Sequence, residues 1–328
     1  MPDFDLTAAL PAAADAFRSA QRITAICHAT PDADTIGGAS AVAIMARKLG
    51  KQAEIVSTDR PAPVFNFLEG IPEARSAPAL APDLAVICDA ATLERVGPIA
   101  RQQADWIGQA RILNVDHHIS NDGFGDVNLV DPHAAATCQV LTSLVKELGI
   151  QLDPPLATAL LTGIIRDSQG FSDKSTTSET LRIAAELVDA GAPIADIHRL
   201  VLIELPYPTL ALWGRMLAGI GERQGGQVVY ATLTQQMLDE TGTQQHDADG
   251  LAEFLARAKE AKVTLLLREL GPDETRVSVR CADGVDATVV AAPFGGGGHR
   301  SRSGATVHAW LDDALPQVLA AAEAALPA

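Results

Sequence analysis

The sequence predicts an α/β protein in which a mainly parallel sheet with flanking helices is followed by a smaller mixed α/β domain. Through about residue 200, short apolar runs alternate with longer alanine-rich segments of helical period, as strands and covering helices do in a parallel sheet. Beyond about residue 220, three strand-like runs accompany one helical segment. A length of 328 residues, 47% of them hydrophobic, is sufficient for two separate cores.

The elements of the first part follow from this alternation. Each expected strand is a short apolar run, and Gly50 fits the C-terminal stop of the first expected helix. The expected strands are 23–27, 54–57, 84–88 and 112–115, and the expected helices are 39–49, 135–148, 156–165 and 178–190.

The pattern changes where prolines interrupt the segment 205–208 and a helix follows through Trp213 and Leu217. We interpret this change as an interdomain connection. The predicted organisation is a first domain at 1–204, a linker at 205–222 and a second domain at 223–328. In the last of these we expect strands at 227–233, 263–268 and 275–280 and a helix at 250–261.

The net charge of −16 disfavours long nucleic acids and anionic membranes as partners, because the average field of the protein repels both. A phosphate-bearing substrate must therefore be captured locally. Metal ions clustered in a cleft can do this, since a bound cation is often the largest local charge in a site.

The remaining composition predicts a cytoplasmic protein without a membrane anchor. The four cysteines are widely separated and form no CxxC pair, which favours reduced, structural thiols. The first twenty residues lack the basic start and apolar core of a secretory leader. The longest apolar stretches, such as 156–165, are too short to span a bilayer.

Ligand-type side chains follow three expected strands. His28, Asp32 and Asp34 come directly after the first, Asp89 ends the third, and Asp116-His117-His118 ends the fourth. Because the carboxyl ends of parallel strands meet at one edge of a sheet, these side chains should converge there. Taken singly, the first group could be an ordinary polar loop, Asp89 a turn or capping residue, and the histidines structural.

Asp167 adds a fourth piece. Leucines and isoleucines three to four residues apart predict a core-facing helix that ends at this acid, where a negative charge opposes the helix dipole unless a cation compensates. The neighbouring Arg166 is a competing explanation.

Oxygen-rich ligands with one or two histidines suit Mn²⁺ or Mg²⁺ better than structural zinc. Two such ions about 3.5–4 Å apart clamp a phosphate and generate a nucleophile, so we expect phosphoester hydrolysis.

A glycine string near the C-terminus provides a second constellation. Successive glycines leave backbone N–H groups uncovered, so a phosphate or base can approach closely, and neighbouring basic side chains add donors. A flexible turn is the alternative, and Arg302 could strengthen phosphate binding or face solvent. The expected substrate-binding residues are Arg280, Gly296, Gly297, Gly298, His299 and Arg302.

Together these motifs resemble, in order and spacing, the four motifs of the DHH phosphoesterase family and the glycine-rich signature of its associated C-terminal domain. The resemblance covers nearly the whole chain. A two-domain protein of this size is similar to the nanoRNase and pAp-phosphatase branch of the family. The resemblance implies two manganese ions, with Mg²⁺ as a substitute. It implies that His28 and Asp32 bind one ion, that Asp34 and His117 bind the other, that Asp89 bridges them and that Asp167 completes the centre. It also implies that Asp116 and His118 are catalytic residues and that His118 contacts the substrate.

The predicted activity is therefore degradation of short RNA or DNA oligonucleotides to mononucleotides and dephosphorylation of adenosine 3′,5′-bisphosphate. A cyclic-dinucleotide or linear dinucleotide phosphodiesterase of the same family is the alternative, and a catalytically silent nucleotide-binding protein is a further one. The string Asp167-Ser168-Gln169-Gly170 departs from the family pattern and leaves substrate preference open. The sequence also leaves the oligomeric state open, a homodimer included.

Overall fold

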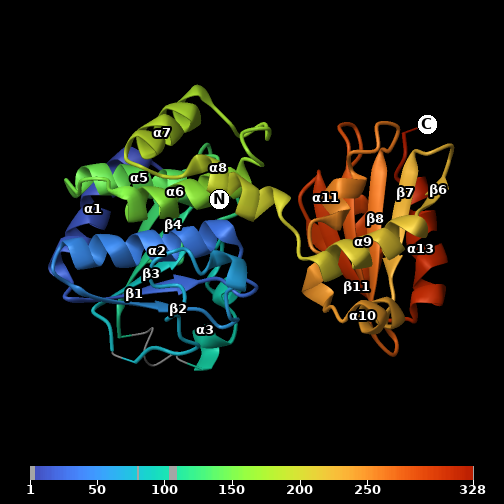
Figure 1. Ribbon diagram of the computed structural model, residues 1–328, viewed down its shortest axis with the longest axis horizontal. Coiled ribbons are helices and arrows are strands. Elements are labelled where there is room, and N and C mark those ends of the chain that lie inside the picture. Colours follow the sequence, from blue (N-terminus) through green and yellow to red (C-terminus); the bar gives the residue numbers. More distant parts are fainter. Residues whose placement is uncertain (1–3, 80, 103–108, 328) are drawn as a thin grey trace. The chain divides into compact units, whose positions relative to one another are not determined.

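The computed structural model describes residues 4–79, 81–102 and 109–327, which form two compact units that divide after Glu204. Figure 1 shows a sheet with flanking helices in each unit. Within the described residues, no helix is both long and apolar enough to cross a membrane.

The sheet of the first unit is entirely parallel, with strand order β2-β1-β3-β4-β5. This confirms the predicted fold class, although the sequence analysis did not identify the last strand. All five residues of β3 are buried, as expected for a central strand covered on both faces. The strands are β1 (Arg22–Cys27), β2 (Gln52–Val56), β3 (Leu84–Cys88), β4 (Arg111–Asp116) and β5 (Val127–Val130).

Helices cover both faces of this sheet. In Figure 1, α2, α5 and α6 lie on one side with α7 outside them, and α3 lies on the other side. The larger core joins side chains of β1, β3 and β4 to those of α1, α2, α5 and α6. The helices are α1 (Leu6–Ser19), α2 (Ala33–Lys48), α3 (Pro98–Gln102), α5 (Thr137–Glu147), α6 (Pro154–Asp167), α7 (Ser178–Asp189) and α8 (Ile194–His198).

Glycines let α2 and α6 pack with their backbones close together. A Cβ atom on Gly37 of α2 would lie 2.5 Å from the carbonyl oxygen of Ala159 on α6. A Cβ atom on Gly163 of α6 would lie 2.3 Å from Oδ1 of Asp34 and 2.4 Å from Sγ of Cys138. Since no side chain fits at either position, the helix crossing depends on these glycines.

The second unit is built on a mixed six-stranded sheet with strand order β10-β11-β9-β8-β7-β6, in which only β7 and β8 pair in parallel. Helices α12 and α13 pack on one face, and α9, α10 and α11 pack on the other. The strands are β6 (Gly221–Arg223), β7 (Val228–Leu233), β8 (Val263–Gly271), β9 (Glu274–Cys281), β10 (Gly297–Gly298) and β11 (Arg302–Val307). The helices are α9 (Tyr207–Ala218), α10 (Gln235–Thr241), α11 (Leu251–Leu255), α12 (Ala287–Ala291) and α13 (Leu311–Ala324).

The expected helix through Trp213 and Leu217 is α9, which buries Leu212 and Met216 in the core of the second unit. The expected helix at 250–261 is shorter, because α11 ends at Leu255. Beyond Leu255 most side chains are exposed, so little packing holds a further helical turn.

We predict that Gly37→Ala lowers the free energy of unfolding of the first unit by about 1–3 kcal/mol, because the new methyl group overlaps the backbone of α6. Gly214→Ala, in α9, is the matched control: a Cβ atom there meets nothing within 4 Å, and the change should be neutral or stabilise by up to about 1 kcal/mol. Calorimetric unfolding of both variants measures this. Equal stabilities would show that the α2–α6 crossing is not tightly packed.

Candidate metal centre

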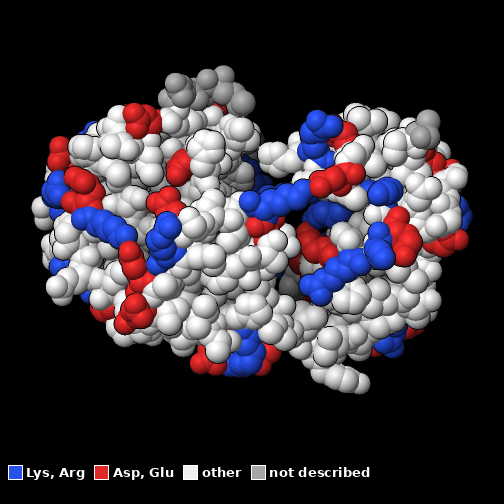
Figure 2. Space-filling view, turned by 90° about the horizontal axis from the view of Figure 1, so that it is seen from above, with Lys and Arg blue, Asp and Glu red and all other residues white. Residues whose placement is uncertain are grey.

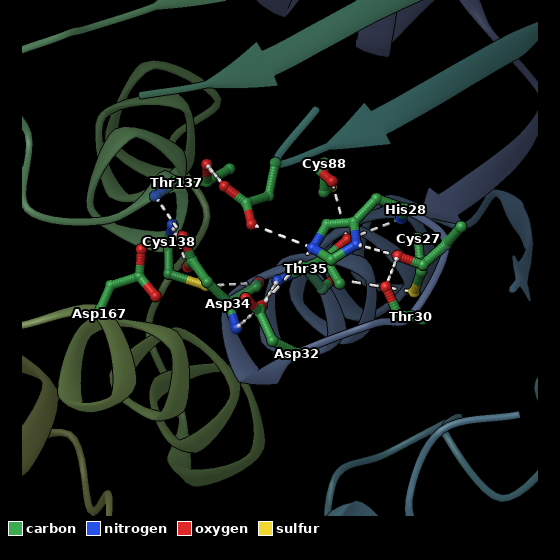
Figure 3. A network of polar contacts seen from close by, with 12 residues as sticks. Cys27, His28, Thr30, Asp32, Asp34, Thr35, Cys88, Thr137, Cys138 and Asp167 are labelled. Carbon is green, nitrogen blue, oxygen red and sulfur yellow. Dashed lines mark hydrogen bonds and ion pairs between the residues drawn. The ribbon is translucent and has the colours of Figure 1, made fainter. Parts of the chain in front are cut away.

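The expected ligand residues meet at one edge of the first sheet. They follow β1, β3 and β4, and Asp167 ends α6 close by. Figure 3 shows His28, Asp32 and Asp34 around the start of α2, with Thr137 and Cys138 approaching Asp34 from α5. The parallel topology brings together the ligand residues that follow β1, β3 and β4, as their positions after apolar strands predict.

His28 is 3% exposed and is held by both of its ring nitrogens. Nδ1 lies 2.8 Å from the carbonyl oxygen of Ala29, which favours the tautomer with the proton on Nδ1. Nε2 then faces Oδ2 of Asp89 at 3.4 Å and Oδ1 of Asp32 at 3.7 Å. Burial acts to lower the pKa of His28, but these two carboxylates raise it to about 10.

Asp32 caps the N-terminus of α2. Its Oδ1 accepts hydrogen bonds from the backbone N–H groups of Asp34 and Thr35, at 3.0 and 3.3 Å. Thr35 is fully buried, and its hydroxyl donates to the carbonyl oxygen of Cys88 at 2.8 Å while accepting from the backbone N–H of His28. This threonine therefore fastens the ends of β1 and β3 to the first turn of α2.

Asp34 is fully buried against the N-terminus of α5. Its carboxylate accepts hydrogen bonds from the backbone N–H groups of Thr137 at 2.6 Å and Cys138 at 3.0 Å. A helix N-terminus favours a negative charge in this position. Burial, together with the nearby Asp89 and Asp167, nevertheless raises the pKa of Asp34 well above its usual value. A cation bound beside it would restore the ionised form.

Asp89 occupies the middle of the cluster. It has a left-handed backbone with φ of 64°, which aspartate tolerates better than most residues. Its Oδ2 faces His28, whereas its Oδ1 lies 3.6 Å from Nε2 of His117 and accepts a 3.0 Å hydrogen bond from the hydroxyl of Thr137. Burial alone would raise the pKa of Asp89, but the neighbouring histidines, including His118, hold it well below its usual range.

His117 and Asp167 form the other side. Nδ1 of His117 lies 3.2 Å from the carbonyl oxygen of Ala134, and Nε2 lies 3.2 Å from Oδ2 of Asp167. Nε2 is buried and has no partner in hydrogen-bonding geometry among the described residues. Burial acts to lower the pKa of His117, whereas the carboxylates of Asp167, Asp89 and Asp34 raise it to about 10.

Ligand atoms from this cluster lie within 4.8 Å of one another in three groups. A buried imidazole nitrogen that lies among carboxylate oxygens without a well-formed hydrogen bond fits a divalent cation, which would bind all of these groups. Two of the groups have separate ligands and could each hold an ion. The groups are His28, Asp32 and Asp89; Asp34, His117 and Asp167; and Asp89, His117 and His118.

Asp116 and His118 lie beside these groups in a hydrogen-bonded chain. Nδ1 of His118 lies 2.7 Å from Oδ1 of the fully buried Asp116. Oδ2 of Asp116 accepts a 2.6 Å hydrogen bond from the side-chain amide of Asn121, which also donates to the carbonyl oxygen of Ala90. Burial acts to lower the pKa of His118, but Asp116 and then Asp89 raise it.

The glycine string of the second unit forms a β-hairpin. Gly297 and Gly298 form β10, and the backbone groups of His299 and Arg302 hydrogen-bond to each other across the turn. A Cβ atom on Gly296 would lie 2.3 Å from the carbonyl oxygen of Gly304, whereas one on Gly297 would meet nothing within 4 Å. The string is therefore an ordered strand at the sheet edge, and its surface at Gly297 is open.

The sequence relationships of the chain agree with this geometry. Residues 22–164 match the model of the DHH family, N-terminal domain, and residues 225–327 match the DHHA1 domain. A bifunctional oligoribonuclease and PAP phosphatase NrnA from Thermus thermophilus is 32% identical over 300 residues, which cover 90% of this chain and 87% of that one. The chain belongs to the DHH family of phosphoesterases.

Other relatives extend over the same length. The Bacillus subtilis protein of the same name is 25% identical and covers 89% of this chain and 91% of its own. Among solved structures, an exopolyphosphatase-related protein from Bacteroides fragilis matches with a TM-score of 0.87 at 21% identity, over 97% of this chain and 96% of that one. The latter likeness establishes the fold of this DHH-family chain.

Three residues of this DHH-family site escaped the sequence analysis. Thr35, Thr137 and Asn121 are each at most 1% exposed. Thr137 donates to Asp89, Thr35 donates to the carbonyl oxygen of Cys88, which precedes Asp89, and Asn121 donates to Asp116. Their only sequence signal is position: each lies within a few residues of a motif or at the start of an expected helix. Nothing in their residue type distinguishes them from ordinary threonines and asparagines.

We predict that Mn²⁺ binding near pH 7 releases protons and strengthens as the pH rises toward 10. The pKa values of His28 and His117 are raised to about 10, so both imidazoles are protonated near pH 7. A cation must displace a proton from each ring that it binds, and raising the pH removes this competition between proton and cation. Titration calorimetry of chelator-treated protein in two buffers of different ionisation enthalpy measures the release. His28→Gln should release fewer protons, whereas His246→Gln, a change at an exposed histidine of the second unit, should not differ from the parent. Binding without proton release would contradict the charge states described here.

Proposed function

We propose that the protein is a manganese-dependent phosphoesterase that degrades short oligonucleotides to mononucleotides and removes phosphate from adenosine 3′,5′-bisphosphate. The observation that carries the proposal is the pair of ligand groups at the edge of the first sheet, which share no residue. The names of the Thermus and Bacillus relatives, each an oligoribonuclease and PAP phosphatase, support the choice of substrate.

The first unit would bind the two ions. His28 and Asp32 would hold one and Asp34 and His117 the other, with Asp89 between them and Asp167 beside the second. Manganese suits a set of carboxylate and imidazole ligands without thiolates, and Mg²⁺ would be its substitute. Two divalent cations held there would activate a water molecule and neutralise charge on the phosphoryl group.

Asp116 and His118 would act on the substrate. Because Nδ1 of His118 is turned toward Asp116, the ring presents Nε2 as the nitrogen that remains for a substrate oxygen. The raised pKa of His118 favours the protonated ring, in which Nε2–H donates to a phosphate oxygen or to the leaving group. Asp116 fixes the orientation of the ring, and Asn121 fixes Asp116.

The second unit would contribute substrate contacts through the hairpin at Gly296–Gly298, His299, Arg280 and Arg302. A net charge of −16 argues against long nucleic acids as substrates. Figure 2 shows basic side chains lying among acidic ones on the face it presents, without a continuous basic surface. Purified protein with Mn²⁺, tested on end-labelled oligonucleotides of graded length and on adenosine bisphosphate, tests the proposal. Inactivity on both substrate classes would refute it.

We predict that Asp89→Asn lowers kcat more than about a hundredfold while leaving the fold intact. The amide keeps the shape of the side chain and tolerates the left-handed backbone, but it removes the charge that the proposal places between the two ions. Steady-state kinetics and circular dichroism measure the two parts. Asp15→Asn, an equal change of charge at an exposed residue of α1, should leave turnover unaltered. Wild-type turnover in Asp89→Asn with full metal occupancy would remove Asp89 from the centre.

A further prediction separates metal binding from substrate binding. Arg280→Ala and His299→Ala should each lower kcat/KM by roughly one to two orders of magnitude, since charge-assisted hydrogen bonds contribute about 1.5–3 kcal/mol, and neither should change Mn²⁺ affinity. Asp34→Ala and His117→Ala should weaken the binding of one ion and lower kcat even at saturating substrate. Titration calorimetry with Mn²⁺ distinguishes the two classes. Loss of an ion in His299→Ala would show that the assignment of roles to the two units is wrong.

A further inference from the structure

Three arginines on neighbouring strands of the second unit form a row, here called the arginine row: Arg276 and Arg280 on β9 and Arg302 on β11. Val277 and Val279 of β9 are buried in the core on the α13 side of the sheet. Because successive side chains of a strand alternate between faces, Arg276 and Arg280 project from the opposite face.

The strand register places Arg302 in the same row. Arg302 lies directly opposite Arg280, and Thr306 lies directly opposite Arg276 in the antiparallel pair of β9 and β11. Directly opposed residues share a face, and two like charges in such a pair repel each other. An anion bound between Arg280 and Arg302 would relieve this repulsion.

Gly304 allows the row to lie flat on the sheet. It is placed between Arg302 and Thr306 along β11, and a Cβ atom built on it would lie only 3.7 Å from Nη2 of Arg276. The guanidinium of Arg276 therefore extends along the strand toward the other two arginines, over a position that carries no side chain. Its planar set of donors stays accessible on the surface.

The row is only partly neutralised by the protein itself. Arg280 donates through Nε and Nη2 to Oε1 of Glu253, at 3.0 and 2.5 Å, and through Nη1 to the carbonyl oxygen of Val279. The side chains of Arg276 and Arg302 are exposed and make no hydrogen bond or ion pair with any other described residue. Among the ion pairs of the described residues, only that of Glu253 with Arg280 joins a carboxylate to a guanidinium of the row.

We propose that the arginine row binds two phosphates of one oligonucleotide, with Arg276 as an outer phosphate site. The inference rests on the proposed function and deepens it. Neighbouring strands are about 4.8 Å apart, so Arg280 and Arg302 can share one phosphate. Arg276 starts four residues along the strand, about 13 Å away, and its guanidinium, which extends back over Gly304, takes a different phosphate of the chain. One of the two phosphates of adenosine bisphosphate must lie at the metal centre to be removed, so only one remains for the row and the two sites cannot both be filled.

The test compares substrates of two lengths in the full-length protein. Arg276→Ala should raise KM about tenfold for an RNA five-mer and leave KM for adenosine bisphosphate within twofold of the parent. Lys259→Ala removes one exposed positive charge of the same unit outside the row, and it should affect neither substrate. The salt dependence of five-mer affinity gives a second readout. The magnitude of the slope of log binding constant against log salt concentration should fall by about 0.7 in Arg276→Ala but not in Lys259→Ala.

Each result decides one question. Equal effects of Arg276→Ala on the five-mer and the bisphosphate, no effect on either, or an equal effect of Lys259→Ala on the five-mer would overturn the outer phosphate site. Arg280→Ala is the reference for the proposed function, because it should weaken both substrates. If Arg280→Ala impairs both and Arg276→Ala impairs neither, the outer site fails while the proposed function stands. If Arg280→Ala impairs neither, the substrate-binding role of the second unit fails.

Discussion

The burial of several carboxylates at one point is the constraint on which the first unit depends. Asp34 and Asp116 are fully buried and Asp89 is 3% exposed. Carboxylates in such positions lose hydration and repel one another, which destabilises the fold unless donors or cations compensate. A neighbouring group compensates each of these carboxylates. Asp34 accepts hydrogen bonds from the first backbone N–H groups of α5, and Asp116 contacts the imidazole of His118 and the side-chain amide of Asn121. Asp89 faces the histidines that follow β1 and β4.

These compensating groups also orient the candidate ligands, so stability and function share the same contacts. Gly163 illustrates the coupling: any side chain there would overlap Oδ1 of Asp34 and Sγ of Cys138. The close crossing of α2 and α6 is therefore also what leaves room for the carboxylate. The three buried cysteines belong to the same hydrophobic core, and burial raises the pKa of the Cys27 thiol to about 12. They act as small apolar groups rather than as nucleophiles.

The convergence of the candidate ligands was predictable because their chemistry and position are both visible in the sequence. Acids and histidines directly after apolar strands are unusual, and parallel topology forces their convergence. Thr137 was not predictable, because its bond to Asp34 joins positions 103 residues apart and depends on where α5 packs. Strands β5, β6, β10 and β11 were missed for a related reason. They are short, or rich in glycine and polar residues, and they form through pairing with neighbours rather than through their own pattern.

In the proposed enzyme the two units would carry positive charge of different physical kinds, and this difference bears on how a strongly acidic protein can handle anionic substrates. Cations in the first unit would be held by buried, preorganised ligands, where interactions are screened little by salt. Arg276 and Arg302 of the arginine row are exposed, so their side chains can adjust to a flexible chain but are screened by ions. A phosphate would gain much from the first kind of site and modestly from the second. Discrimination by length is then expected to arise from the exposed row, because only there does each added phosphate change the number of contacts.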